Sequence, residues 1–339
     1  MTKRVYVKNV PIGGGADVSV QTMCNTKTSD YDATIRSILR LADAGADIVR
    51  LSIPDKESIN SLKRIVLESP IPIVADIHYD YKLALDSIEA GVHKLRINPG
   101  NLKKEGISLV AKLAKERGVP IRIGVNQGSQ NVKYSPSELA KLCVDTAHLM
   151  EDNGTDQLVL AVKSSNVNDT VCAYRELSKL TDYPLHVGLT EAGTANMGIT
   201  KSNVAIGSLL LDGIGDTIRV SLTDDPIKEV QEGIKILRAV GLRKDYAEVI
   251  SCPTCARTYI DVQELANKVE NLVKTVKKPL KIAVMGCSVN GIGESKDADF
   301  GVCGGKTQSI IFKNKEIIKT VDNQEVLKEL IKLTEEYDA

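Results

Sequence analysis

The stretch IVRLSIPDKESINSLKRIVLESPIPIVADIH, residues 48–78, contains the repeating unit of this chain. It begins with an apolar run rich in β-branched residues, continues with the spacing of an amphipathic helix, and ends in a second apolar run. The same strand-then-helix unit recurs eight times; the pattern of apolar residues repeats, but the residues themselves do not. Such alternation predicts parallel strands joined by helical crossovers.

The expected strands follow one another at similar intervals. They cover 18–23, 48–53, 72–78, 94–98, 121–126, 158–162, 185–189 and 217–222. Glycines stand where the helices between them should end, at Gly45, Gly91, Gly118 and Gly154. Eight units over about 240 residues match a (β/α)8 TIM barrel in number and in size. A doubly wound sheet is the alternative, but it seldom has eight regular units. We therefore predict an α/β barrel, preceded by a short hairpin within 4–15.

The regular pattern ends around Leu242–Tyr246, and we expect the domain boundary there. The barrel, a substrate-binding domain, would cover 1–243, and a small α+β domain would cover 244–339. In the second domain we expect a strand ending at Ile250, a helix over 262–276, a strand over 282–285, a hairpin over 308–320 and a C-terminal helix.

Composition excludes several classes of protein. Of the 339 residues, 42% are hydrophobic and 26% are charged, as in ordinary globular proteins. Lys plus Arg and Asp plus Glu both number 44, so no overall charge favours nucleic acid or a membrane surface. No apolar run approaches the ~20 residues of a membrane span, and no signal-peptide pattern opens the chain. Seven cysteines, an odd number, indicate reduced thiols and a cytoplasmic protein.

Three cysteines of the second domain suggest a metal centre. They are Cys252 and Cys255, in a Cys-x-x-Cys pair, and Cys287, which follows the buried strand. Thiolates gathered in a reduced protein favour a metal or an iron–sulfur cluster over a disulfide. The fourth ligand is either Glu294, in the Gly-rich loop after Cys287, or Cys303. A carboxylate would leave one iron exchangeable and able to meet a substrate. A structural zinc site, or a chance pair with no metal, remains an alternative. Cys143 and Cys172, on expected helices, should be small core residues.

Polar residues late in the barrel strands predict the active site, because barrel enzymes place it at the carboxyl ends of their strands. Residues two apart on a strand share a face, which pairs Asp76 with His78, Arg96 with Asn98, and Arg219 with Ser221, and which places Arg122 and Asn126 together with Gly124 between them.

Five cations from five different strands would meet at this opening: Arg50, Arg96, Arg122, Lys163 and Arg219. Crowding them together is costly unless an anion with several charges binds, and arginine geometry suits phosphate oxygens. Ion pairs with loop acids are the alternative. Asp76, His78, His186 and Glu191 share the same rim, and a carboxylate there could serve as a general acid or base.

These motifs resemble the 4-hydroxy-3-methylbut-2-enyl diphosphate synthase family of the non-mevalonate isoprenoid pathway, in its short two-domain bacterial form. The resemblance covers nearly the whole chain. Its segments are 10–14, 20–23, 75–78, 95–101, 121–126, 190–193, 213–221, 252–255 and 285–294.

The resemblance implies a 4Fe-4S enzyme that reductively opens 2-C-methyl-D-erythritol 2,4-cyclodiphosphate with loss of water. Ferredoxin or flavodoxin would supply two electrons. Cys252, Cys255, Cys287 and Glu294 fall on the cluster ligands, and Glu191 falls on the proposed acid or base. The diphosphate-binding positions are Arg50, Arg96, Asn98, Arg122, Lys163, Arg219 and Ser221. Family enzymes are homodimers in which the cluster domain of one subunit closes the barrel of the other.

Two other classes of function fit the residues less well. One is a barrel lyase or transferase that uses Lys163 as a Schiff base beside a structural zinc domain. The other is a non-catalytic iron–sulfur redox sensor, for which the cationic barrel mouth would be superfluous. Metal analysis separates zinc from iron, and turnover of the cyclodiphosphate separates an enzyme from a sensor.

Overall fold

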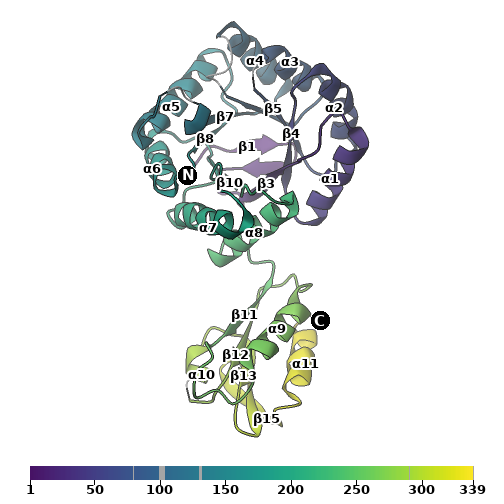
Figure 1. The fold of residues 1–339 in the computed structure, drawn as a ribbon, viewed down its shortest axis with the longest axis vertical. Helices are drawn as coiled ribbons and strands as arrows, with labels where there is room; N and C mark the ends of the chain where they lie inside the picture. The colour runs from purple at the N-terminus through teal and green to yellow at the C-terminus, as the bar shows by residue number, and fades with distance from the viewer. Residues whose placement is uncertain (79, 99–103, 130–131, 290, 339) are drawn as a thin grey trace. The chain divides into compact units, whose positions relative to one another are not determined.

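The computed structural model describes residues 1–78, 80–98, 104–129, 132–289 and 291–338. It consists of two compact units, Met1–Leu242 and Arg243–Ala339 (Figure 1). Residues 99–101 of the family-like segment 95–101, and Asn290 in the segment after Cys287, lie outside the described residues.

The first unit is a barrel of parallel strands. Its strands are β3 (Ser19–Met23), β4 (Ile48–Ser52), β5 (Ile73–Ile77), β6 (Lys94–Ile97), β7 (Ile121–Asn126), β8 (Leu158–Lys163), β9 (His186–Val187) and β10 (Thr217–Ile218). The hydrogen-bonded order is β8-β7-β6-β5-β4-β3-β10-β9, and a parallel bridge from Leu160 to Leu185 links β8 to the start of β9. The strands therefore close into a ring, which confirms the predicted TIM barrel.

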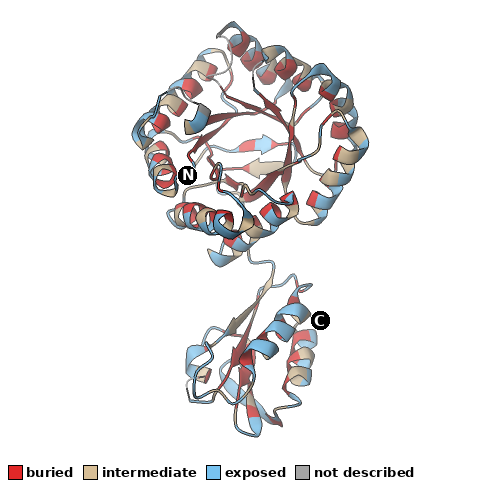
Figure 2. Cartoon of the chain, in the orientation of Figure 1, coloured by how far each residue is buried: buried red, intermediate tan, exposed pale blue. Residues whose placement is uncertain are grey.

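Helices surround this ring (Figure 1). They are α1 (Tyr31–Asp43), α2 (Lys56–Glu68), α3 (Tyr81–Glu89), α4 (Lys104–Arg117), α5 (Pro136–Asp152), α6 (Val167–Leu180), α7 (Ala195–Leu211) and α8 (Pro226–Ala239). The four glycines predicted at helix ends all have positive φ. Figure 2 shows the strands buried and the outer faces of the helices exposed, because each helix turns its apolar stripe inward.

A hairpin covers one end of the barrel. It consists of β1 (Val5–Val7) and β2 (Val10–Ile12), paired antiparallel. Val7 and Ile12 pack against Ile48 and Val74, which lie at the starts of β4 and β5. The hairpin therefore fills the amino end of the barrel, which leaves the carboxyl end for a site.

The second unit is a five-stranded mixed sheet with helices. Its elements are β11 (Ala247–Ser251), α9 (Val262–Val273), β12 (Leu280–Met285), α10 (Gly291–Glu294), β13 (Phe300–Cys303), β14 (Gln308–Lys313), β15 (Glu316–Asp322) and α11 (Val326–Asp338). The strands lie in chain order, with β11, β12 and β13 parallel and the last two pairings antiparallel. α9 and α11 pack on one face of the sheet, and Met285, Ile292 and Cys303 pack together on the other.

Several predicted elements differ from the structure. Strand β13 was not predicted, because its Phe-Gly-Val-Cys run is short and lacks clear alternation. α9 ends at Val273, three residues early, and the expected loop after Cys287 contains the helical turn α10. β9 and β10 are each two residues long, although strands over 185–189 and 217–222 were expected.

The cysteines outside the second unit are only partly as expected. Cys143 is buried, which confirms its assignment to the core. The same prediction for Cys172 is wrong: this residue is exposed on α6, because the buried face of α6 is formed by Val171, Ala173 and Tyr174 instead. Among the helices of the described ranges, none is long and apolar enough to cross a membrane.

Candidate functional site

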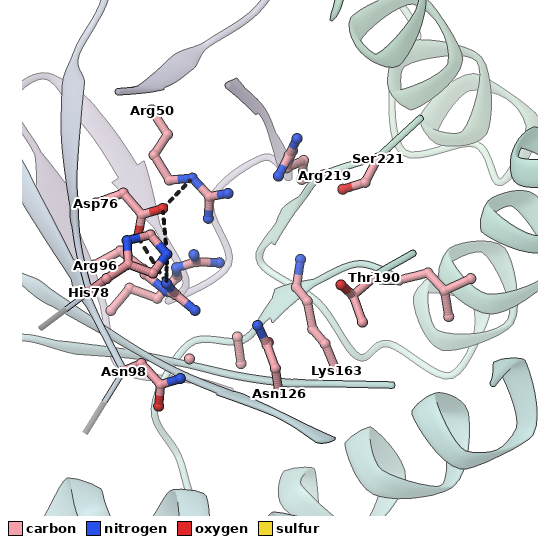
Figure 3. A pocket seen from close by; sticks show the side chains of 14 residues that line it. Arg50, Asp76, His78, Arg96, Asn98, Asn126, Lys163, Thr190, Arg219 and Ser221 are labelled. Carbon is pink, nitrogen blue, oxygen red and sulfur yellow. Dashed lines mark hydrogen bonds and ion pairs between the residues drawn. The ribbon is translucent and has the colours of Figure 1, made fainter. Parts of the chain in front are cut away.

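A cavity of about 190 Å³ lies at the carboxyl ends of the barrel strands (Figure 3). Its walls are mostly polar side chains from seven strands or the loops that follow them. They are Arg50, Asp76, His78, Arg96, Asn98, Arg122, Gly124, Asn126, Ala161, Lys163, Leu189, Thr190, Arg219 and Ser221. All five predicted cations are present, and so is every residue expected to bind substrate except His186.

Asp76 fixes two of the cations. It stands opposite Arg96 in the register of β5 and β6, and Arg96 stands opposite Arg122. Its carboxylate accepts a hydrogen bond from Arg96 Nη1 at 3.0 Å and lies 3.6 Å from Arg50 Nε. Burial acts to raise the pKa of Asp76, but the charges of Arg50 and Arg96 outweigh it and lower the pKa to about 2. Asp76 is therefore ionised near neutral pH and orients arginines rather than donating a proton.

Glu229 fixes a third cation, and the sequence did not single it out. This residue lies in the first turn of α8 and is 4% exposed. Its two oxygens lie 3.5 and 3.4 Å from Arg219 Nη2. A helical carboxylate is ordinarily a solvated surface charge, so only the packing of α8 against β3 reveals its position.

Arg122 and Lys163 have no such counter-charge. Among the described residues no carboxylate pairs with either of them, and Arg122 Nε and Nη1 have no hydrogen-bond partner. Both side chains are buried. Burial first, and then the charge of Arg122, lowers the pKa of Lys163 well below its usual value. Cations this poorly compensated favour the binding of an anion.

Two glycines make room for the cations. A Cβ at Gly188 would lie 2.8 Å from Lys163 Nζ and 2.5 Å from the Arg219 carbonyl oxygen. A Cβ at Gly124 would lie 3.2 Å from Arg96 Nε. Side chains at these positions would displace the charged groups, and in Figure 3 Lys163 and Arg50 extend from different strands towards the same space.

His186 does not lie where the sequence placed it. It is fully buried and does not line the cavity. Because alternate residues of a strand face the same side, His186, Gly188 and Thr190 all point into the barrel. Thr190 lines the cavity, and His186, four residues earlier in the chain, lies deeper along the barrel axis. Burial, and then the charge of Arg122, lowers the pKa of His186 well below its usual value, so the ring is neutral.

Lys94 is also buried in the barrel and donates to Gln21 Oε1 at 3.0 Å. Because Lys94 lies two residues before Arg96 on the same strand, the sequence could have indicated that both side chains point into the barrel.

Glu191, the predicted acid or base, is exposed beside the cavity rather than in its wall. Its φ of 53° is unusual for a residue with a side chain. A Cβ at Gly128 would lie 3.4 Å from Glu191 Oε1, so the side chain approaches the turn after β7. Its catalytic role stays a prediction.

The predicted cluster ligands lie at neighbouring strand ends in the second unit. Cys252 follows β11 and Cys287 follows β12, which are paired in parallel. Cys252 Sγ accepts a hydrogen bond from the Gly286 N–H at 3.1 Å. Hydrogen bonds from the backbone and side chain of Arg257 lower the pKa of Cys255. The pKa of Arg257 is raised by Cys255, and also by the charges of Cys287 and Glu294, so all three lie near this guanidinium.

This donor set fits an iron–sulfur cluster. N–H groups directed at sulfur and a neighbouring cation both favour thiolates, which are the ligands of such clusters. Among the described residues no three His, Cys, Asp or Glu side chains are close enough to hold one ion.

Cys303 has a packing role. It is 1% exposed on β13, beneath α10. A Cβ at Gly291 would lie 2.3 Å from Cys303 Sγ, so the thiol is in close contact with the start of this helical turn. Burial raises the pKa of Cys303 to about 12. Glu294, by contrast, is exposed at the end of α10.

Family models match both units. The GcpE TIM-barrel domain matches residues 2–234, and the GcpE protein C-terminal domain matches residues 248–336.

Similar proteins span nearly the same length. A 4-hydroxy-3-methylbut-2-en-1-yl diphosphate synthase (flavodoxin) from Caldanaerobacter subterraneus subsp. tengcongensis is 49% identical over 98% of this chain and 96% of its own length. A protein of the same name from Clostridium acetobutylicum is 48% identical over 98% of this chain and 97% of its own.

Solved structures resemble the barrel unit in fold alone. A dihydropteroate synthase from Yersinia pestis covers 71% of this chain and 98% of its own, with a TM-score of 0.55 at 14% identity. One from Thermus thermophilus covers 70% and 99%, with a TM-score of 0.52 at 15% identity.

Proposed function

The chain belongs to the GcpE family, and we propose that it acts as a 4-hydroxy-3-methylbut-2-enyl diphosphate synthase. Its substrate is then 2-C-methyl-D-erythritol 2,4-cyclodiphosphate. The ring opens as two electrons and a proton enter, one hydroxyl leaves as water, and 4-hydroxy-3-methylbut-2-enyl diphosphate is released.

The observation that carries this proposal is the convergence of five cations from five strands on one cavity. Asp76 and Glu229 compensate three of them, while Arg122 and Lys163 lack a described counter-charge. A diphosphate supplies the missing negative charge and several acceptor oxygens. A neutral or singly charged substrate would leave buried charge uncompensated.

Most of the polar wall residues then have a part in binding. Arg122, Lys163 and Arg219 bind the diphosphate oxygens, together with Arg50 and Arg96, which Asp76 keeps in place. Asn98, Asn126 and Ser221 provide neutral hydrogen bonds to the phosphates or the sugar-derived hydroxyls. His78 adds a partly exposed ring at the rim. Glu191, beside the rim, is the proposed proton donor for the departing hydroxyl.

Cys252, Cys255, Cys287 and Glu294 would hold a 4Fe-4S cluster. When bound, the cluster supplies electrons and a Lewis-acidic iron for the leaving oxygen. The chain's own part is to hold and orient the sulfurs: the Gly286 N–H donates to Cys252 Sγ, and hydrogen bonds from Arg257 lower the pKa of Cys255. A carboxylate such as Glu294 is displaced from iron more easily than a thiolate.

The remaining partners follow from this assignment. Flavodoxin or ferredoxin would donate the electrons, and a cytoplasmic setting would keep the cysteines reduced. We also propose a homodimer, the state implied by the family resemblance. Inactive Cys287→Ala and inactive Glu191→Gln chains, mixed to form heterodimers, should then regain part of the activity. Heterodimers without any activity would show that each chain works alone.

The direct test is turnover by anaerobically purified protein. We expect conversion of the cyclodiphosphate with dithionite as reductant, and with reduced flavodoxin. Stoichiometric zinc without sulfide, together with no turnover, would contradict the proposal.

One observation favours another chemistry. A buried lysine with a lowered pKa is the kind of residue that forms a Schiff base, and Lys163 is such a residue. Borohydride trapping of a carbonyl substrate on Lys163, in protein free of iron, would support the lyase alternative.

A further inference from the structure

Glu229 is a buried carboxylate outside the wall of the cavity. It comes from α8, one layer outside the barrel strands, and is 4% exposed. Close packing brings it inward, because Gly233 lets α8 approach β3: a Cβ there would lie 3.0 Å from Val20 Cγ1. A carboxylate this deep requires hydrogen-bond donors for both oxygens.

The scaffold supplies two of these donors. The Leu222 N–H donates to Glu229 Oε1 at 2.9 Å, and Thr22 Oγ1 donates to Oε2 at 3.1 Å. One donor is on the loop after β10 and the other is on β3. The carboxylate is therefore fixed to the barrel frame independently of the cavity.

The third partner is a cavity residue. Arg219 Nη2 lies 3.4 Å from Glu229 Oε2 and 3.5 Å from Oε1. Arg219 Nε has no partner among the described residues. The guanidinium is thus held at Nη2 by a fixed anion, and Arg219 also lines the cavity.

We propose that Glu229 is a positioning residue for the reaction, which holds the Arg219 guanidinium in the orientation that receives the substrate diphosphate. This inference rests on the proposed function. Glu229 does not line the cavity; it pairs with Arg219, and its charge also raises the pKa of Arg50. Asp76, by contrast, lies in the wall beside the arginines that it fixes.

Two physical effects of Glu229 oppose each other, and their balance tests the proposal. Its negative charge weakens the attraction of the cavity for any anion, so neutralising it would tighten binding. Its anchoring of Arg219 spares the complex the cost of ordering that side chain, so removing it would weaken binding. Positioning requires the second effect to be the larger one.

The first experiment compares Glu229→Gln with Glu232→Gln in the cluster-loaded enzyme. Glu232 lies on the same helix and pairs with Lys235, so its variant controls for a charge lost from α8. We expect Glu229→Gln to raise the KM for the cyclodiphosphate by about tenfold and to change kcat less than about threefold. Glu232→Gln should leave both constants unchanged. A lower KM in Glu229→Gln would overturn the proposal, because charge would then outweigh positioning.

The second experiment asks whether the effect passes through Arg219. Arg219→Gln and the double variant Glu229→Gln/Arg219→Gln complete a double-mutant cycle. We expect the double variant to match Arg219→Gln in KM within about twofold, since nothing remains to be positioned. Fully additive losses would show that Glu229 acts elsewhere and would overturn the inference.

A milder variant guards against a folding defect. Thr22→Val removes one donor from the carboxylate and keeps the charge and the shape. If Glu229→Gln does not fold, as judged by its melting curve and iron content, Thr22→Val is the test. It should raise KM by about twofold to threefold in the wild-type background and not at all with Arg219→Gln. No rise in the first background would overturn the inference. Turnover by wild-type enzyme separately decides the proposed function.

Discussion

The cavity at the barrel mouth and the cysteine group of the second unit differ in what holds their side chains in place. At the mouth, Asp76 and Glu229 fix three arginines, and the strands set the spacing of all five cations. In the second unit Cys255 and Glu294 are exposed, and no three described ligands converge on a point.

The difference indicates that the two sites reach their working form in different ways. The mouth is preorganised by the chain itself, so its charges need little rearrangement when substrate arrives. We expect the cysteine group to become ordered by the cluster that we propose it holds, because metal binding and local folding are coupled. The predictions below test this contrast, from the largest expected effect to the smallest.

The largest effect should follow the loss of one thiolate. Cys287→Ala should abolish the brown absorption, and iron and sulfide should fall from about four each per chain to almost none. Turnover should disappear with them. Because the mouth is preorganised, calorimetric binding of the cyclodiphosphate should persist within about threefold.

Cys172→Ala is the matched control, since this thiol is exposed on α6, in the barrel unit. It should retain the full iron content. Loss of substrate binding in Cys287→Ala would break the contrast, because the mouth would then depend on the cluster.

The second effect concerns a cation that lacks a counter-charge. Arg122→Ala should lower kcat/KM by about 10²-fold, since a charge-assisted contact to phosphate is worth a few kcal/mol. Iron content should not change. Arg117→Ala, which removes an exposed arginine paired with Glu89, is the control and should be neutral. Loss of iron from Arg122→Ala would show that the two sites are not separate.

The sequence predicted the barrel from the regular alternation of strands and helices, and most of the mouth residues from the alternation of side chains along each strand. Strand alternation places Arg96 with Asn98, and Arg219 with Ser221, on one inward face, and the structure brings these residues together. Strand alternation does not predict how deep a residue lies along the barrel axis. We therefore expected His186 at the rim, although the structure buries it deeper in the barrel. Strand alternation also says nothing about helices that reach inward, which is why Glu229 escaped notice.

In the second unit the sequence predicted the elements better than their detail. Cys287 was expected after a buried strand and Cys252 after a strand ending at Ile250, and the two cysteines follow strands β12 and β11, which are parallel neighbours. The turn α10 and strand β13 were missed, because both are four residues long and too short for periodicity. The proximity of Arg257 to Cys255, Cys287 and Glu294 has no sequence signature beyond adjacency to the Cys pair.

The third prediction separates a ligand from a packing residue. Cys303→Ser should keep the cluster and reduce activity by no more than about threefold, because Cys303 is buried beneath α10. Glu294→Ala should leave a labile cluster and little turnover, since the exchangeable iron loses its carboxylate. Iron content after gel filtration in air measures the difference. Should Cys303→Ser lose iron while Glu294→Ala keeps it, the two assignments must be exchanged.

The smallest effect is a change in the protonation of Lys163: when the substrate binds, this amine should take up a fraction of a proton. Burial and the neighbouring arginines lower the pKa of this amine in the free protein, and a bound diphosphate would raise it again. Binding should therefore take up protons at any pH between those two values, and affinity should fall as pH rises through that window. Calorimetry in buffers of different ionisation enthalpy measures the uptake. Lys163→Met should abolish this proton uptake, and Lys179→Met, at an exposed site on α6, should not.

Unchanged uptake in Lys163→Met would place the proton on another group and leave Lys163 charged before substrate arrives. The mouth would then be fully preorganised in charge as well as in geometry, which would make its contrast with the cysteine group larger.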